Sequence, residues 1–99
     1  MAALNDIQVA EKLLPIEKRI RNMNNFSRAD VQDSLNAIWG NGYSPDKKKE
    51  ILKDMIARTG VKNIGIRTLY TPRAGLTEGD KTMDFLSDLM SYSGVKERY

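Results

Sequence analysis

Apolar residues recur along most of this chain at intervals of three and four, the spacing that places them on one face of an α-helix. The pattern predicts helices within residues 5–22, 27–40, 44–60 and 77–94. In chain order, the predicted apolar faces are Leu4, Ile7, Ala10, Leu13, Leu14, Ile16, Ile20 and Met23; Val31, Leu35, Ile38 and Trp39; Ile51, Leu52, Met55 and Ile56; and Met83, Leu86, Leu89 and Met90, with Phe85 on the flank. We therefore expect a mainly α-helical protein.

The predicted helix boundaries rest on residues that satisfy free backbone groups. The expected N-caps, whose side chains accept hydrogen bonds from the first helical turn, are Asn5, Ser27, Ser44 and Thr77. Gly60 is expected to end the third helix in the left-handed conformation. Pro15 lacks a backbone donor, so the first region is expected either as one bent helix or as two pieces, with Pro15 opening the second.

Residues 64–70 follow a different pattern. Ile64, Ile66, Thr68 and Tyr70 alternate with other residues, which is typical of an extended segment. Gly65 disfavours a helix here by roughly 1 kcal/mol relative to alanine. We predict a single domain, residues 1–99, built as a small bundle of four to five short helices with one extended connector near residues 64–70.

The composition narrows the chemistry available to the chain. It has 99 residues, 40% of them hydrophobic and 29% charged, with no His and no Cys. Zinc sites built from imidazole and thiolate, thiolate nucleophiles and disulfides are therefore excluded. The side chain that ordinarily titrates near neutral pH is missing as well. We expect no enzymatic activity, no catalytic residue, no metal site and no cofactor.

Charge and hydropathy indicate which partners the chain could meet. The sequence contains no run of 18 apolar residues, so we expect no membrane partner. The expected location is the cytoplasm, or a virion or host cell if the protein is viral. The net charge is +3. The basic excess is concentrated in residues 61–76, where Lys62, Arg67 and Arg73 occur without an acidic residue. Such a segment favours a charged or polar neighbour.

The function that these features favour is a non-enzymatic protein-interaction or assembly module that binds another protein or itself, for instance as a subunit of a larger complex such as a viral one. Trp39 and Tyr43 flank two glycines, and aromatic residues in such loops often anchor partners. The alternative interpretation is that Trp39 completes the core while the glycines end a helix. Ile64, Ile66 and Tyr70 complete the predicted partner-binding set, because an apolar extended segment can add to a partner's sheet.

A second hypothesis is DNA binding. Residues 51–70 resemble a helix-turn-helix unit, with Gly60 in the turn and apolar residues after it. The resemblance implies that Lys62, Asn63 and Arg67 face DNA, and Arg73 is added from the same basic segment. Two positions depart from the motif. They are Ile56, where a small residue is usual, and Gly65, which falls inside the second helix.

Overall fold

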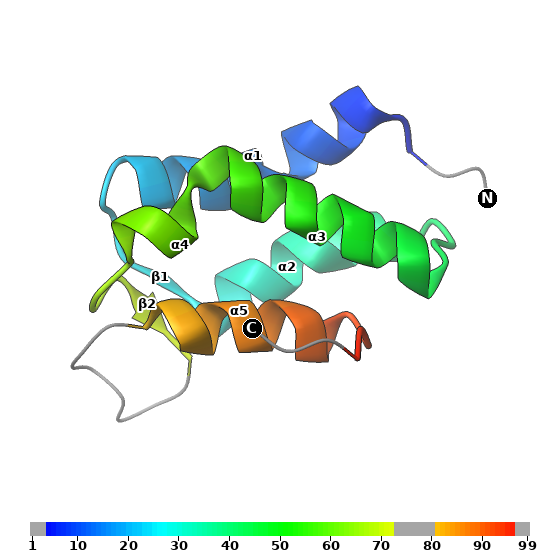
Figure 1. Cartoon of the computed structure of the whole chain (residues 1–99). Helices are drawn as coiled ribbons and strands as arrows, with labels where there is room; N and C mark the ends of the chain where they lie inside the picture. The colour runs from blue at the N-terminus through cyan, green and yellow to red at the C-terminus, as the bar shows by residue number, and fades with distance from the viewer. Residues whose placement is uncertain (1–3, 73–80, 97–99) are drawn as a thin grey trace.

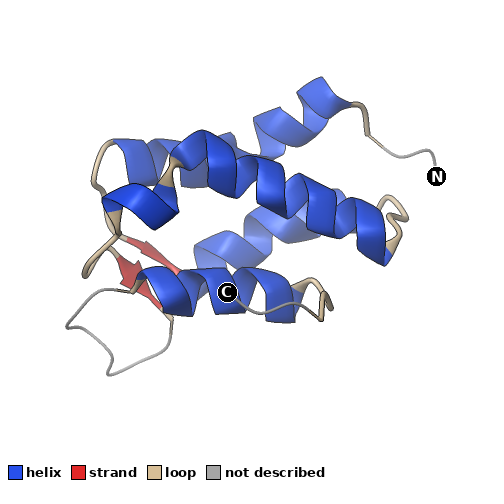
Figure 2. Ribbon diagram, in the orientation of Figure 1, coloured by secondary structure: helices blue, strands red, loops and turns tan. Residues whose placement is uncertain are grey.

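Five helices and two short strands make up the part of the chain that this computed structural model describes, residues 4–72 and 81–96 (Figures 1 and 2). The elements are α1 (Asp6–Arg21), β1 (Phe26–Ser27), α2 (Arg28–Trp39), α3 (Pro45–Thr59), α4 (Val61–Ile64), β2 (Tyr70–Thr71) and α5 (Thr82–Tyr92). The predicted fold class, a small bundle of short helices, is confirmed.

The four longer helices close around one core. Helix α1 contacts α2 and α3, and α5 contacts the same two helices, so each of the four packs against two of the others. The larger side chains that are almost fully excluded from solvent are Leu13, Ile16, Ile20, Leu35, Ile38, Leu52, Met55, Ile66, Tyr70, Phe85, Leu86 and Leu89. They come from all four helices, from the connector before β2 and from β2 itself, so a single core holds the described chain together.

Local chemistry fixes most helix starts as predicted. The Asn5 side chain accepts from the backbone N–H of Gln8 at 2.9 Å, and the Gln8 side chain accepts from the backbone N–H of Asn5 at 2.9 Å. Ser44 accepts from the backbone N–H of Lys47 at 3.2 Å, just before the proline that opens α3. The predicted cap Thr77 lies outside the described residues, and α5 begins at Thr82.

Of the two alternatives for Pro15, the structure has the single helix. Helix α1 continues from Asp6 to Arg21 with Pro15 inside it. Pro15 and Glu11, whose carbonyl loses its helical donor, are both exposed. Water can therefore replace the missing hydrogen bond, which makes the proline tolerable in the middle of the helix.

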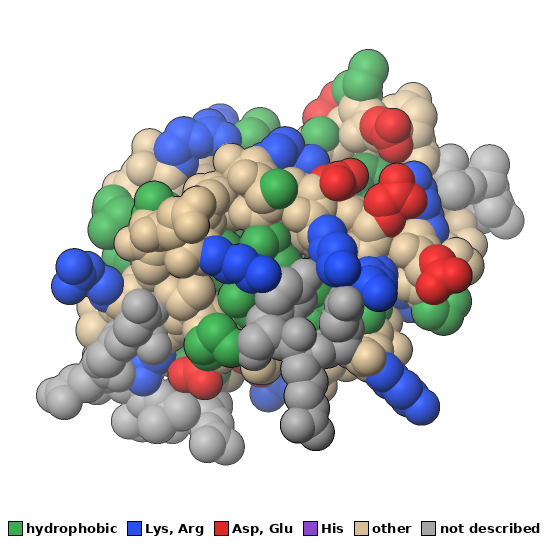
Figure 3. Space-filling view, viewed as in Figure 1, with side chains coloured by type: hydrophobic (Ala, Val, Ile, Leu, Met, Phe, Trp, Pro, Cys, Tyr) green, Lys and Arg blue, Asp and Glu red, His purple; other side chains and the backbone are tan. Residues whose placement is uncertain are grey.

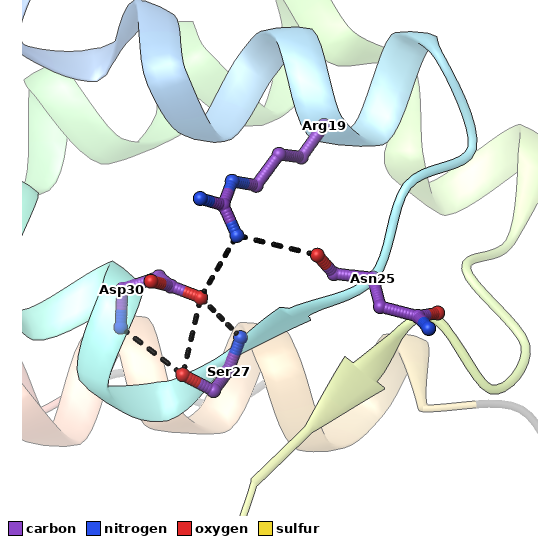
Figure 4. Close-up of polar contacts among 4 residues, drawn as sticks. All are labelled: Arg19, Asn25, Ser27 and Asp30. Carbon is purple, nitrogen blue, oxygen red and sulfur yellow. Dashed lines mark hydrogen bonds and ion pairs between the residues drawn. The ribbon is translucent and has the colours of Figure 1, made fainter.

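The end of α1 is tied to the start of α2 by a polar cluster (Figure 4). The Arg19 guanidinium donates to the Asp30 carboxylate at 3.1 Å and to the backbone carbonyl of Asn25 at 3.3 Å. Asp30 also accepts from the backbone N–H of Ser27 at 2.8 Å, and Ser27 accepts from the backbone N–H of Asp30 at 3.3 Å. The predicted N-cap Ser27 is thus confirmed, and Asp30, its partner in the cap, is joined to α1 through Arg19.

The connector is extended over fewer residues than predicted. Ile64 is the last residue of α4, and extended pairing is confined to β2, which runs parallel to β1 with Phe26 opposite Tyr70 and Ser27 opposite Thr71. The rings of Phe26, Tyr70 and Phe85 lie 5.1 to 5.4 Å apart, centroid to centroid, and Phe85 meets the other two edge to face. This aromatic cluster holds the two short strands against α5, which explains how a two-residue pairing persists.

Five side chains predicted for the apolar faces are exposed: Ile7, Ala10, Leu14, Met23 and Met83. Ile7 is 72% exposed, Leu14 37% and Met83 51%, whereas Phe85, predicted on the flank, is fully buried. The reason is geometric: successive residues on a helix differ by about 100° in direction, and Leu13 falls within the side of α1 that α2 and α3 cover whereas Leu14 falls outside it. The same argument separates Met83 from Phe85 on α5.

Candidate interaction surfaces

Trp39 and Tyr43 join three segments of the chain instead of projecting from it. Their rings pack edge to face at 5.8 Å, and the Trp39 indole N–H donates to the Ser93 hydroxyl at 3.0 Å. The Tyr43 hydroxyl accepts from the backbone N–H of Leu4 at 2.9 Å and donates to its carbonyl at 3.3 Å. The Lys48 ammonium lies 5.4 Å from the centre of the indole ring. Both aromatic side chains are half-buried, so each has a structural role and retains some accessible surface.

Ile66 and Tyr70, two of the predicted partner-binding residues, belong to the core. Both are fully buried, so neither offers surface to a partner in this fold. The Tyr70 hydroxyl donates to the Asp88 carboxylate at 2.6 Å. Burial, and then this hydrogen bond, raises the pKa of Tyr70 well above its ordinary value. The alternation instead reflects side chains that point inward: the Tyr70 ring packs against Phe26 and Phe85, and the Ile66 backbone N–H donates to the Thr82 hydroxyl at 3.0 Å.

Ile64, Lys62 and Asn63 occupy the exposed side of α4. Lys62 and Asn63 line an open hollow of about 390 Å³ against α3, and Ile64 is 53% exposed. Helix α4 has four residues, so the second helix that a helix-turn-helix needs is reduced to one turn. The left-handed Gly65 that follows it, with φ of 67°, ends the helix where the motif would continue.

Arg67 is exposed in the turn before β2, and its φ of 47° is unusual for a residue with a side chain. Met23, in the loop between α1 and β1, has a φ of 58° and is 54% exposed. Figure 1 shows both loops at the same end of the bundle, beside the two strands. Arg73, the remaining residue of the predicted nucleic-acid set, lies outside the described residues.

A surface that the sequence interpretation assigned to the core is the outer side of α1. Ile7, Ala10 and Leu14 are exposed there, and their spacing places them along one line of the helix. We call these three residues the α1 ridge. The sequence contains a sign of this second apolar face. Leu13 and Leu14 are adjacent and therefore lie on different sides of the helix, and the rest of the chain covers only the side of Leu13.

Beside the α1 ridge, α1 is joined to α3 by an ion pair. The Arg58 side chain donates to the Glu17 carboxylate at 3.0 Å, and Glu17 is 5% exposed while Arg58 is 46% exposed. Further along, an open hollow of about 250 Å³ separates the two helices, with Asp6, Ala10 and Glu50 among its lining residues. The ion pair therefore ties α1 to α3 beside the α1 ridge.

Charges are unevenly distributed over the surface. In the view of Figure 3, Asp and Glu side chains gather over the starts of α1 and α3, and Lys and Arg side chains lie over the end of α1 and along α3. Among residues 4–72 and 81–96, no three acidic side chains are grouped as a metal site would require. Within the same residues, no helix has the length and apolar character needed to cross a membrane.

Comparisons with protein-family models, curated proteins and solved structures give no match for this chain. Fold and surface therefore define a class only: a small, mainly α-helical protein whose first helix carries an uncovered apolar face.

Proposed function

We propose that this chain is a non-enzymatic protein-interaction or assembly module. The observation that carries the proposal is the α1 ridge, in which an isoleucine that is 72% exposed and a leucine that is 37% exposed share one side of a helix. Single apolar side chains on a surface are common, but an aligned set on one element is typical of a contact surface. The sequence supports the non-enzymatic part, because the chain has no His and no Cys. We place such a module in the cytoplasm or within a larger complex, for instance a viral one.

The proposal revises the partner-binding set. Ile64 remains a candidate on the far end of the bundle, and Trp39 and Tyr43 remain partly accessible. Ile66 and Tyr70 leave the set because they are buried. Ile7 and Leu14 enter the set. Among the helices that the structure describes, α1 is the one with two exposed large aliphatic side chains.

Site-specific photo-crosslinking tests the proposal. A photoreactive phenylalanine analogue is placed at Ile7 or Leu14, with matched controls at Ala37 and Ser91, which are exposed on α2 and α5. After irradiation in the cells that make the protein, adducts with protein are expected at the first two positions and at neither control. Equal labelling at all four positions, or no adduct at any, would show that the α1 ridge is not a contact surface.

DNA binding remains the second candidate, favoured by the exposure of Lys62, Asn63 and Arg67 near one end of the bundle. It predicts a duplex affinity that falls steeply as salt rises, because bound cationic side chains release counterions from the phosphates. The test is the mobility of a labelled duplex at low salt. An Arg67→Ala variant should weaken the complex, and unchanged mobility with the native chain would eliminate this candidate.

A further inference from the structure

The α1 ridge extends beyond its apolar residues in both directions. Ile7, Leu14 and Arg21 are spaced seven residues apart, close to two helical turns, so they stand on the same side of α1. Leu14 is the midpoint of the three. All three side chains are exposed, which means that this side of the helix is open over its whole length of roughly 24 Å.

Charges along the same side of α1 divide by sign. On the half before Leu14, Glu11 lies on this side and Asp6 lies at its edge, next to α3; Lys18 and Arg21 lie on the half after it. All four are exposed. Figure 3 shows the same division at the level of the surface, with acidic side chains over the start of α1 and basic side chains over its end. Turning the helix end to end therefore exchanges its acidic half with its basic half.

From this pattern we propose that the α1 ridge binds a second copy of this chain, with the two α1 helices antiparallel about a two-fold axis at Leu14. Turning one copy end to end places Glu11, three residues before the axis, next to Lys18 of the second copy, four residues after it. The same rotation places Asp6 near Arg21, and the aliphatic part of Arg21 over Ile7. The inference rests on the proposed function and identifies its partner.

Self-complementarity is what favours a second copy over an unrelated protein. A two-fold interface brings one surface against itself, so acidic and basic groups must lie at equal distances on opposite sides of the axis. Glu11 and Lys18, and at the ends Asp6 and Arg21, meet this condition to within one residue. The antiparallel arrangement also opposes the two helix dipoles favourably. A contact of this size falls at the small end of specific interfaces, so the dimer is expected to be weak and concentration-dependent.

The test combines single charge reversals with their double exchange. Sedimentation equilibrium of the native chain from about 5 to about 500 µM should show a monomer–dimer equilibrium. Glu11→Lys and Lys18→Glu should each raise the dimer Kd about tenfold at low salt, because two symmetric attractions become repulsions. The double variant Glu11→Lys/Lys18→Glu should restore the native Kd, since the exchanged charges again face each other. Asp33→Lys, an exposed reversal on α2, is the matched control and should leave the Kd unchanged.

Each outcome supports or overturns the inference. A native chain that stays monomeric at the highest concentration overturns it, and so does a dimer in which the double variant remains as weak as the single ones. Leu14→Lys should abolish the dimer, and circular dichroism of each variant at low concentration verifies that the monomer is folded. If the chain is monomeric while the photoreactive group at Ile7 captures a different protein, the second copy is refuted and the proposed function stands. If neither occurs, both fail.

Discussion

Replacing Gly60 by alanine should destabilise this fold, whereas the same replacement at Gly40 should stabilise it. The two glycines follow α3 and α2, and the chemical change is identical. Gly60 has φ of 64° and ψ of 22°, in the left-handed region, while Gly40 has φ of −64° and ψ of −6°, which any residue adopts. The pair therefore separates backbone strain from every other effect of adding a methyl group.

The expected magnitudes follow from the backbone and from the space around each site. At Gly60, an added Cβ would meet no heavy atom of the described residues within 4 Å, so the cost is conformational alone. A left-handed alanine costs about 1–2 kcal/mol. The smaller entropy of the unfolded alanine chain returns about 0.4–1 kcal/mol. The net loss is thus about 1 kcal/mol, which lowers Tm by roughly 4–8 °C in a domain of this size.

At Gly40, the new Cβ would lie 3.8 Å from the Asn36 carbonyl oxygen, an ordinary van der Waals contact. Only the unfolded-state effect remains there, so stability should rise by about 0.4–1 kcal/mol. Urea unfolding of both variants and the native chain, analysed with a common m-value, measures the two differences. A loss at Gly40 equal to that at Gly60, or a gain at both, would refute the assignment of these glycines to different backbone conformations.

Three further outcomes are expected. Arg58→Ala should cost about 1–3 kcal/mol in urea unfolding, because it leaves the buried Glu17 carboxylate without its donor. Adding Glu17→Leu should recover most of that loss, and a further loss would contradict it. The raised pKa of Tyr70 means that its hydroxyl keeps the proton in the folded state, whereas the unfolded chain releases that proton near pH 10.0. The free energy of unfolding should therefore be unaffected by this group below pH 10.0 and should fall as the pH rises above it. The slope should be about 1.4 kcal/mol per pH unit. A Tyr70→Phe variant measured at the same pH values should lack this component, and an equally steep decline in the variant would exclude Tyr70 as its source. Met23→Gly should stabilise the chain by about 0.5–1 kcal/mol, since it relieves a left-handed methionine with φ of 58°, and a lower urea midpoint would contradict this.

The helix ends could be predicted from the sequence because their causes are local. Asn5 and Ser27 cap their helices through residues three positions on, and Gly60 adopts its left-handed conformation immediately after α3. A contact between neighbours in sequence leaves its signature in a few letters. The same holds for the inner face of α3, where apolar residues lie on one side only.

The connector and the strand pairing could not be predicted in this way, because their causes lie far along the chain. Tyr70 is buried against Phe26 and Phe85, which precede and follow it by many residues. Alternation over residues 64–70 indicates an extended segment but does not say whether its apolar side faces the core or the outside. Ile66 and Tyr70 were assigned to a partner for that reason, and the parallel pairing of β1 with β2 had no local signal at all.

The orientation of α1 follows from a limit on how much apolar surface a small chain can cover. A folded chain of 99 residues buries a smaller share of its surface than a larger one, so each helix is covered mainly on one side. Helix α1 carries Val9, Leu13, Ile16 and Ile20 on the covered side and the α1 ridge on the other. The buried Glu17 lies between these two sides and holds α1 in place through Arg58, which prevents a rotation that would exchange one apolar side for the other. Breaking that ion pair should therefore disturb the α1 ridge as well as the stability of the fold, and the Arg58→Ala variant should dimerise more weakly than the native chain even where both are fully folded.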